Sequence, residues 1–140
     1  MKKKQNNITK AKAKPLLIVE KKDGKLWGRV TIKGNLIYDL ANNLAALKKK
    51  LITLISEFEN IEVTDFEVSY DLTTFFEQFS YLNITDIAKR AGINPGLMRQ
   101  YSSGIKFPSE DRVIEIEDAI RAIGKELSRV KLHKPKPEYV

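Results

Sequence analysis

The chain has 140 residues, 42% of them apolar, and a formal net charge of +7, so it can form a core and is not disordered throughout. It contains no cysteine, which excludes disulfides, thiolate zinc sites and a cysteine nucleophile. No apolar run approaches the roughly 20 residues of a membrane span, and no signal-type apolar segment follows the basic start, so we expect a cytoplasmic, nucleoid-associated protein and no membrane partner.

Residues 1–14 form a basic segment with few large apolar side chains. They hold six lysines and no acid, which leaves a net charge of only +1 for the rest of the chain. We therefore predict a disordered basic tail over 1–14. Two interpretations of its charge stay open: an arm that contacts phosphates or an acidic partner, and a tail that only keeps the chain in solution.

Three short β-prone runs follow the tail. The first two, Leu16–Val19 and Leu26–Lys33, are separated by the Asp-Gly pair of the segment KKDGK, which is a strong hairpin signal. Apolar and polar residues alternate along the second run, as in a strand with one buried face. Gly34-Asn35 predicts a second turn, and Leu36-Ile37-Tyr38 begins a third strand. The pattern predicts a three-stranded meander.

An amphipathic helix is expected after Asn43, whose side chain can cap it. Apolar residues recur in it at spacings of 3, 4, 3 and 4, and Ile52 and Ile55 widen this stripe. The lysines at 48–50 lie mostly outside the stripe, which favours a solvated face over a binding patch. A fourth, half-buried strand is predicted over 66–70, so the order is β-β-β-α-β. The residues of the stripe are Leu44, Leu47, Leu51, Leu54 and Phe58.

The sequence gives little support for catalysis. It holds no phosphate-binding loop, dinucleotide fingerprint, zincin helix or nucleophile elbow, and its single histidine, His133, lies in the C-terminal tail. A metal-dependent nuclease would need the acids Glu62, Asp65 and Glu67, but strand alternation predicts that Asp65 and Glu67 face solvent. We therefore predict that the chain is not an enzyme and has no catalytic residue, no cofactor and no metal site.

A further helix, capped by Asp71, is predicted over 72–81, with Phe75, Phe76 and Phe79 filling a helical core. The segment after it, 83–104, reads NITDIAKRAGINPGLMRQYSSG and predicts two short helices joined by a tight turn. Asn83 can cap the first of these helices, which ends at Gly92.

Asn94 can cap the second helix, in which Pro95 takes the first position and which ends near Ser103. Helical spacing separates its two faces: Leu97, Met98 and Tyr101 lie on one, and four small or polar residues lie on the other. The outward residues are Gly96, Arg99, Gln100 and Ser103.

Arg99 and Gln100 carry the groups that read base edges, and Lys106 follows as a phosphate contact. A helix of this length spans about 13 Å, which suits a DNA groove roughly 12 Å wide. The alternative is an αα-hairpin that only packs.

Ser109 caps the last predicted helix, whose apolar stripe continues to Val130. A small bundle needs only the first half of this stripe. We predict that Ile123, Leu127 and Val130 pack on the sheet domain or on a second subunit, and that 133–140 form a tail.

The segment 83–104 and the run Gly104–Ser109 resemble the helix-turn-helix of the XRE/Cro-type repressor family, with Ala88 in the first helix and Gly92 in the turn. The resemblance covers roughly 72–127 and implies an all-α, lambda-repressor-like bundle. The chain departs from the family pattern at Ile84, Ser103 and Ile105. Two sets of DNA contacts are implied. The DNA-facing residues are Asn94, Pro95, Gly96, Arg99, Gln100 and Ser103, of which Asn94, Gly96, Arg99, Gln100 and Ser103 are expected to read bases. The phosphate contacts are Lys89, Arg90 and Lys106.

The hairpin IVEKKDGKLWGRVTI, the helix NNLAALKKKLITLISEF and the junction FEVSYDLTTFFEQF, followed by a DNA-binding helix set, resemble the HicB family of antitoxins. The resemblance covers about 16–132. It implies an α+β chain with a partial ferredoxin-like or ribonuclease-H-like domain at 15–71 and a helix-turn-helix domain at 72–132.

It also implies a bacterial DNA-binding homodimer or higher homo-oligomer that binds double-stranded DNA, represses its own operon and blocks a HicA-type, mRNA-cleaving ribonuclease toxin. Since segment 33–39 departs from the family pattern, a stand-alone regulator stays an alternative. So does a toxin-sequestering or dimerisation module without DNA binding.

Overall fold

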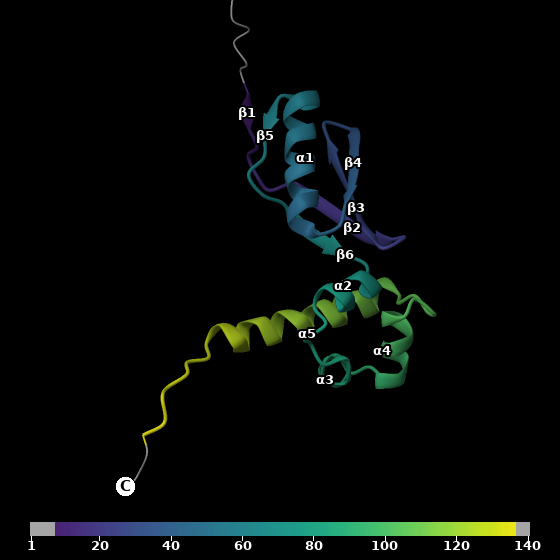
Figure 1. The fold of residues 1–140 in the computed structure, drawn as a ribbon. Coiled ribbons are helices and arrows are strands. Elements are labelled where there is room, and N and C mark those ends of the chain that lie inside the picture. The colour runs from purple at the N-terminus through teal and green to yellow at the C-terminus, as the bar shows by residue number, and fades with distance from the viewer. Residues whose placement is uncertain (1–7, 137–140) are drawn as a thin grey trace, which may run out of the picture. The chain divides into compact units, whose positions relative to one another are not determined.

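The computed structural model describes residues 8–136, in which the chain is α+β and divides into two compact units, the first ending at Gln78 and the second beginning at Phe79 (Figure 1). The elements of the first unit are β1 (Thr9–Lys10), β2 (Leu16–Lys22), β3 (Lys25–Ile32), β4 (Asn35–Ala41), α1 (Leu44–Glu59), β5 (Ile61–Glu62), β6 (Glu67–Tyr70) and α2 (Leu72–Gln78). Those of the second unit are α3 (Ile84–Ala91), α4 (Pro95–Ser102) and α5 (Glu110–Ser128).

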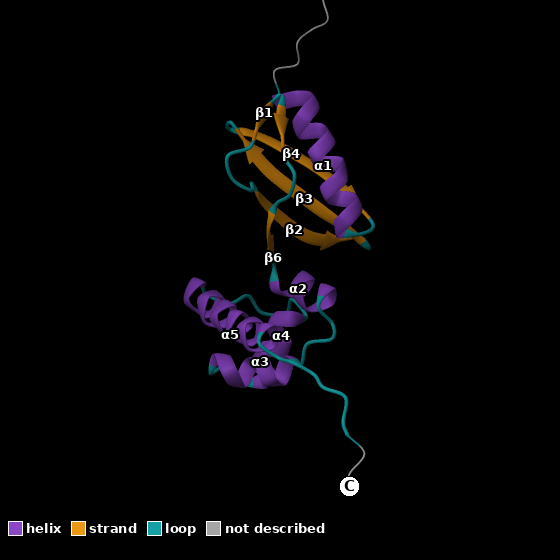
Figure 2. Cartoon of the chain, turned by 90° about the vertical axis from the view of Figure 1, so that its left-hand side faces the viewer, coloured by secondary structure: helices purple, strands orange, loops and turns teal. Residues whose placement is uncertain are grey.

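The predicted β-β-β-α-β order is present, as a mixed sheet of strand order β4-β3-β2-β6 with α1 across one face (Figure 2). β2, β3 and β4 are antiparallel neighbours, and β6 pairs with β2 in parallel. Asp23 and Gly24 have φ of 52° and 74°, as a two-residue Asp-Gly hairpin turn requires. The second turn lies at Lys33 and Gly34, one residue earlier than predicted, because Asn35 already pairs with Ile32.

α1 begins at the predicted cap, where Asn43 Oδ1 accepts a hydrogen bond from the Ala46 N–H at 2.8 Å. Its buried row is Leu47, Leu51 and Ile55, each 0% exposed. The prediction for Phe58 was wrong, since this side chain is 73% exposed and Ile55 takes the inward position near the end of the helix. The row therefore advances by four residues at each step along the sheet.

Gly28 in β3 has no room for a side chain between the strand and α1. A Cβ at this position would lie 2.8 Å from Leu47 Cδ2 and 2.9 Å from Leu17 Cδ1, and both leucines are fully buried. The missing side chain thus lets Leu17 and Leu47 fill the space above the strand.

Residues 8–14 differ from the predicted disorder, whereas residues 1–7 of the predicted tail lie outside the described residues. β1 pairs in parallel with β5, with Thr9 opposite Ile61, and Ala11 packs against the core. Lys14 Nζ lies 3.6 Å from Asp65 Oδ2. The other oxygen of the same carboxylate, Oδ1, accepts a 2.8 Å hydrogen bond from Lys48 Nζ on α1. The ion pairs with Lys14 and Lys48 thereby connect the N-terminal segment to α1.

α2 ends at Gln78 rather than Tyr81 and belongs to the first unit, so the units divide later in the chain than the sequence suggested. The Lys21 N–H donates a 2.9 Å hydrogen bond to Thr74 Oγ1, which is buried, and Lys21 Nζ pairs with Glu77 at 2.8 Å. Phe75 makes an edge-to-face contact with Tyr70 of β6, so at least this predicted core aromatic packs with the sheet. None of the helices of residues 8–136 has the length and apolar character needed to cross a membrane.

Replacement of Gly28 by alanine is expected to lower the free energy of unfolding of the first unit by about 1–3 kcal/mol, because the added methyl group overpacks Leu17 and Leu47. Urea unfolding followed through Trp27, the only tryptophan of the chain, reports on this unit. Gly124→Ala is the matched control, since a Cβ added to this glycine of α5 would have no packing neighbour within 4 Å. Equal midpoints for Gly28→Ala and the unchanged chain would contradict the close approach.

The hydrogen bond from Lys48 lowers the pKa of Asp65 from 3.8 to about 2. A carboxyl whose pKa is lower in the folded state contributes stability above its unfolded pKa, and this contribution is lost as the pH falls from about 4 to about 2. We expect Asp65→Asn to destabilise the first unit at neutral pH, with the difference from the unchanged chain vanishing towards pH 2. Lys48→Met should reduce the change in stability between about pH 4 and pH 2, measured as unfolding followed through Trp27. If stability depends on pH in the same way in the unchanged chain and in both variants, the ion pair does not contribute.

Candidate nucleic-acid interface

α3 is fixed at both ends as the sequence predicts. Asn83 Oδ1 accepts a 3.1 Å hydrogen bond from the Asp86 N–H, and Gly92 ends the helix with a left-handed φ of 71°. Ile87 and Ala88 are buried, and the small side chain of Ala88 is 0% exposed between helices. α3, against which α4 packs, is therefore fixed in place by its caps and its buried side chains.

α4 is held by a side-chain cap and two buried side chains. Asn94 Oδ1 accepts hydrogen bonds from the N–H groups of Gly96 at 2.8 Å and Leu97 at 3.3 Å. Met98 is 0% exposed and Tyr101 is 7% exposed. The two buried side chains set the rotation of the helix about its axis, so its opposite face must point to solvent.

The outward face of α4 carries the predicted residues. Gly96, Arg99 and Ser103 are exposed and Gln100 is partly exposed. Asn94 differs from the other residues predicted to read bases, because its side-chain oxygen Oδ1 already accepts the hydrogen bonds that cap α4. Its contribution to this surface is therefore the placement of α4.

Arg99 is oriented by a contact that sequence reasoning missed. Its Nη2 donates a 3.0 Å hydrogen bond to Thr85 Oγ1 in the first turn of α3. The guanidinium has further N–H groups for a ligand, since arginine carries five donors. Thr85 is thus a positioning residue that helical periodicity within α4 alone cannot reveal.

The segment after α4 is held mainly by hydrogen bonds to the backbone carbonyl of Gln100. The Gln100 oxygen accepts hydrogen bonds from the N–H groups of Ile105 at 3.0 Å and Lys106 at 3.2 Å, and from Ser103 Oγ at 3.2 Å. Gly104 has a φ of 79°, which places the chain in the left-handed region after the helix. Lys106 is thereby held close to the end of α4.

The three predicted phosphate contacts differ in their surroundings. Lys89 and Lys106 are exposed, whereas Arg90 Nη2 lies 2.8 Å from Glu126 Oε2 on α5. This hydrogen bond and its charge raise the pKa of Arg90 and lower that of Glu126. Lys89 and Lys106 are therefore better placed for phosphates than Arg90, which connects α3 to α5.

The apolar stripe of α5 is buried only around Ile116 and Ala119, whereas Val113 near the start of the helix is 39% exposed. Ile116 is 1% exposed and Ile123 is partly exposed, whereas Leu127 and Val130 are 60% and 58% exposed. The last two side chains of the predicted packing stripe therefore remain accessible. Leu127 lies in the last turn of α5, whereas Val130 follows the helix, which ends at Ser128 and so is shorter than the predicted stripe.

No family model, curated protein or solved structure matched this chain when it was compared with all three.

We expect Asn94→Ala to lower the free energy of unfolding of the second unit by about 0.5–2 kcal/mol, because two N–H groups of α4 lose their acceptor. Urea unfolding followed by far-ultraviolet circular dichroism measures the change. Asn94→Ser is the matched control and should stay near the unchanged chain, since a serine hydroxyl also caps helices. Equal losses for both variants would show that the cap does not hold α4.

Proposed function

We propose that the chain is a sequence-specific DNA-binding protein in which α4 enters the major groove. The observation that carries this proposal is the division of α4 into a face held by Met98 and Tyr101 and an outward face with Arg99 and Gln100. Arginine reads guanine and glutamine reads adenine through paired hydrogen bonds to the base edge. α4 thus has the size, the polarity and the fixed orientation of a helix that reads base pairs.

Lys89 and Lys106 would contact phosphates on either side of the groove. They carry positive charge before and after α4: Lys89 lies in the last turn of α3, ahead of the turn into α4, and Lys106 follows α4. Phosphate contacts fix the position of a protein on DNA but carry no sequence information. Sequence preference is therefore assigned to α4 and salt-dependent affinity to the lysines.

A two-fold dimer would place two such helices on one face of DNA. Their separation would be about one helical turn, roughly 34–36 Å. The exposed Leu127 and Val130 offer an apolar contact for a second copy, next to Ile123. This proposal therefore joins the end of α5 to dimerisation and α4 to base reading.

Neutralisation of a HicA-type toxin, the other half of the role that the resemblance to HicB antitoxins implies, is a second candidate function. It is favoured by the first unit, a separate compact body with its own core that the DNA contact of α4 does not use. The identity of the neighbouring reading frame decides between a HicB-type antitoxin and a stand-alone regulator. A short basic protein encoded there that co-purifies with this chain would favour the antitoxin.

Arg99→Ala should weaken binding to the preferred DNA by about 1–3 kcal/mol and relax the preference at one base pair, because one base-edge contact is lost. Lys106→Ala should weaken binding to all sequences alike and reduce the salt slope by about one. Selection from randomised duplexes gives the preferred site, and fluorescence anisotropy at several salt concentrations gives both quantities.

The matched control is Arg121→Ala, which removes an exposed arginine from α5 that pairs with Glu117 at 3.4 Å. It should leave sequence preference unchanged. If Arg99→Ala and Arg121→Ala lose the same affinity on preferred and random DNA, base reading by α4 is excluded.

A further inference from the structure

The hydrogen bond between Thr85 and Arg99 joins two helices whose backbones are each fixed by other contacts. Thr85 is the second residue of α3, in the turn where Asn83 Oδ1 accepts a 3.1 Å hydrogen bond from the Asp86 N–H. Arg99 follows Met98 in α4, and the Met98 side chain is 0% exposed. Since both backbones are held, the 3.0 Å bond from Arg99 Nη2 to Thr85 Oγ1 fixes the place of the guanidinium on the outward surface.

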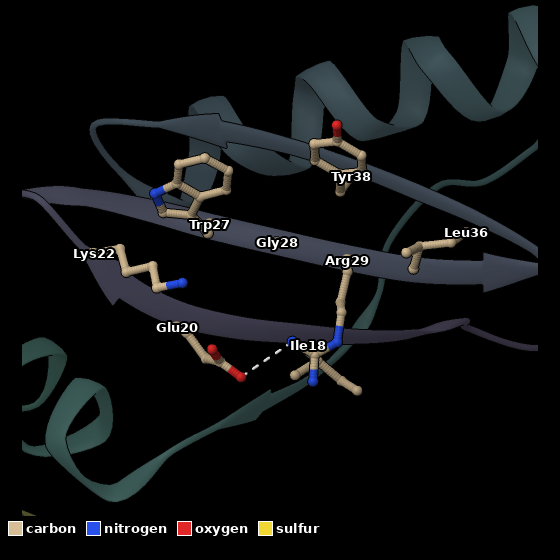
Figure 3. A pocket seen from close by; sticks show the side chains of 8 residues that line it. All are labelled: Ile18, Glu20, Lys22, Trp27, Gly28, Arg29, Leu36 and Tyr38. Carbon is tan, nitrogen blue, oxygen red and sulfur yellow. Dashed lines mark hydrogen bonds and ion pairs between the residues drawn. The ribbon is translucent and has the colours of Figure 1, made fainter. Parts of the chain in front are cut away.

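The partner of Arg99 is a neutral hydroxyl, whereas several other arginines are held by carboxylates. On the face of the sheet that α1 does not cover, Arg29 Nη1 lies 3.1 Å from Glu20 Oε1 (Figure 3). Three further arginines pair with glutamates in the same way: Arg90, Arg112 and Arg121. Arg99 takes part in none of the ion pairs among residues 8–136. Thr85 therefore orients the positive charge of Arg99 without neutralising it.

The bond to Thr85 also leaves one complete edge of the guanidinium free. A guanidinium has two edges on which a pair of N–H groups can point at the same base: Nη1 with Nη2, and Nη2 with Nε. Nη2 contributes one of its two N–H groups to each edge, and only one of these is used by Thr85 Oγ1. The pair of donors that remains matches O6 and N7 of guanine, the one base that presents two neighbouring acceptors in the major groove.

An arginine that is ordered before DNA arrives discriminates better between bases. Immobilising a side chain with many rotamers at the moment of binding weakens the contact by about two- to tenfold. Thr85 orders the guanidinium in the free protein, so a guanine contact is strengthened by about that factor. A base that cannot accept both hydrogen bonds does not form the contact and is not bound more tightly.

We propose that Thr85 sets the preference of this chain for guanine at the base pair that Arg99 reads, without touching that base. The inference rests on the DNA binding proposed for α4 and adds to it the base and the residue of α3 that selects it. Thr85 acts through the Arg99 guanidinium and is a positioning residue. α3 thus takes part in base selection in addition to supporting α4.

The test compares Thr85→Val, which removes the hydroxyl and keeps a branched side chain, with Thr85→Ser, which keeps the hydroxyl. Loss of preference in Arg99→Ala first identifies the base pair that Arg99 reads in the selected duplex, and a base other than guanine there overturns the proposal. Fluorescence anisotropy then measures affinity for this duplex and for the three duplexes with another pair at that position.

We expect Thr85→Val to lower the preference for guanine by about two- to tenfold while affinity for the other three duplexes stays the same. Thr85→Ser should retain the preference. Ser102→Ala is the matched control, because Ser102 Oγ donates a 3.0 Å hydrogen bond to the carbonyl of Arg99 and not to its guanidinium. This variant loses a hydroxyl next to the same residue and should keep the preference for guanine.

A double-mutant cycle separates positioning from a direct contact of Thr85 with DNA. In the Arg99→Ala background, Thr85→Val should have no further effect, since the hydroxyl acts only through the guanidinium. A further loss of affinity on all four duplexes in that background would assign Thr85 to a phosphate contact and overturn the proposal.

The free protein gives a readout that does not depend on DNA. Nuclear magnetic resonance relaxation of the Arg99 Nε–H group should show a lower order parameter in Thr85→Val than in Thr85→Ser. Equal unfolding midpoints by circular dichroism would show that the fold is unchanged in both. An unaltered order parameter, or an unaltered preference for guanine in Thr85→Val, overturns the role of Thr85 while base reading by α4 stands. Absence of sequence preference in the unchanged chain would instead overturn the proposed function itself, and this inference with it.

Discussion

The burial of Met98 and Tyr101 is the constraint on which the outward surface of α4 depends. Both side chains are almost inaccessible, so the helix cannot rotate about its axis without exposing apolar area or leaving a cavity. The cap of Asn94 fixes where the helix begins, and Gly104 turns the chain away after it. These contacts set the direction of the Arg99 side chain, and its hydrogen bond to Thr85 Oγ1 orients the guanidinium.

In the first unit, burial likewise sets the direction of the side chains, which alternate between the two faces of the sheet with a period of two residues. Most side chains that point towards α1 are apolar and buried, and Gly28 has no room for a Cβ beside Leu47 of α1. Their neighbours along each strand point to the other side, where Trp27 and Tyr38 sit beside Arg29. The alternation that forms the core therefore also forms the open face on the other side of the sheet.

Several ion pairs among residues 8–136 join segments that are distant in sequence. Asp65 connects the N-terminal segment to α1 through Lys14 and Lys48, and Arg90 connects α3 to α5 through Glu126. Such partly exposed pairs stabilise a protein modestly, but they decide which charges remain for a ligand. In the second unit, Lys89 and Lys106 are exposed, which supports the phosphate contacts that we propose for them.

The sequence by itself determined the local elements: the caps at Asn43, Asn83 and Asn94, the Asp-Gly turn, and the apolar face of α4, because these depend on residues a few positions apart. The tertiary structure decided what depends on distant partners. It paired β1 with β5, placed α2 with the sheet and engaged Arg90 with Glu126. No local pattern encodes these contacts, since each one forms only after segments far apart along the chain have been brought together by the core.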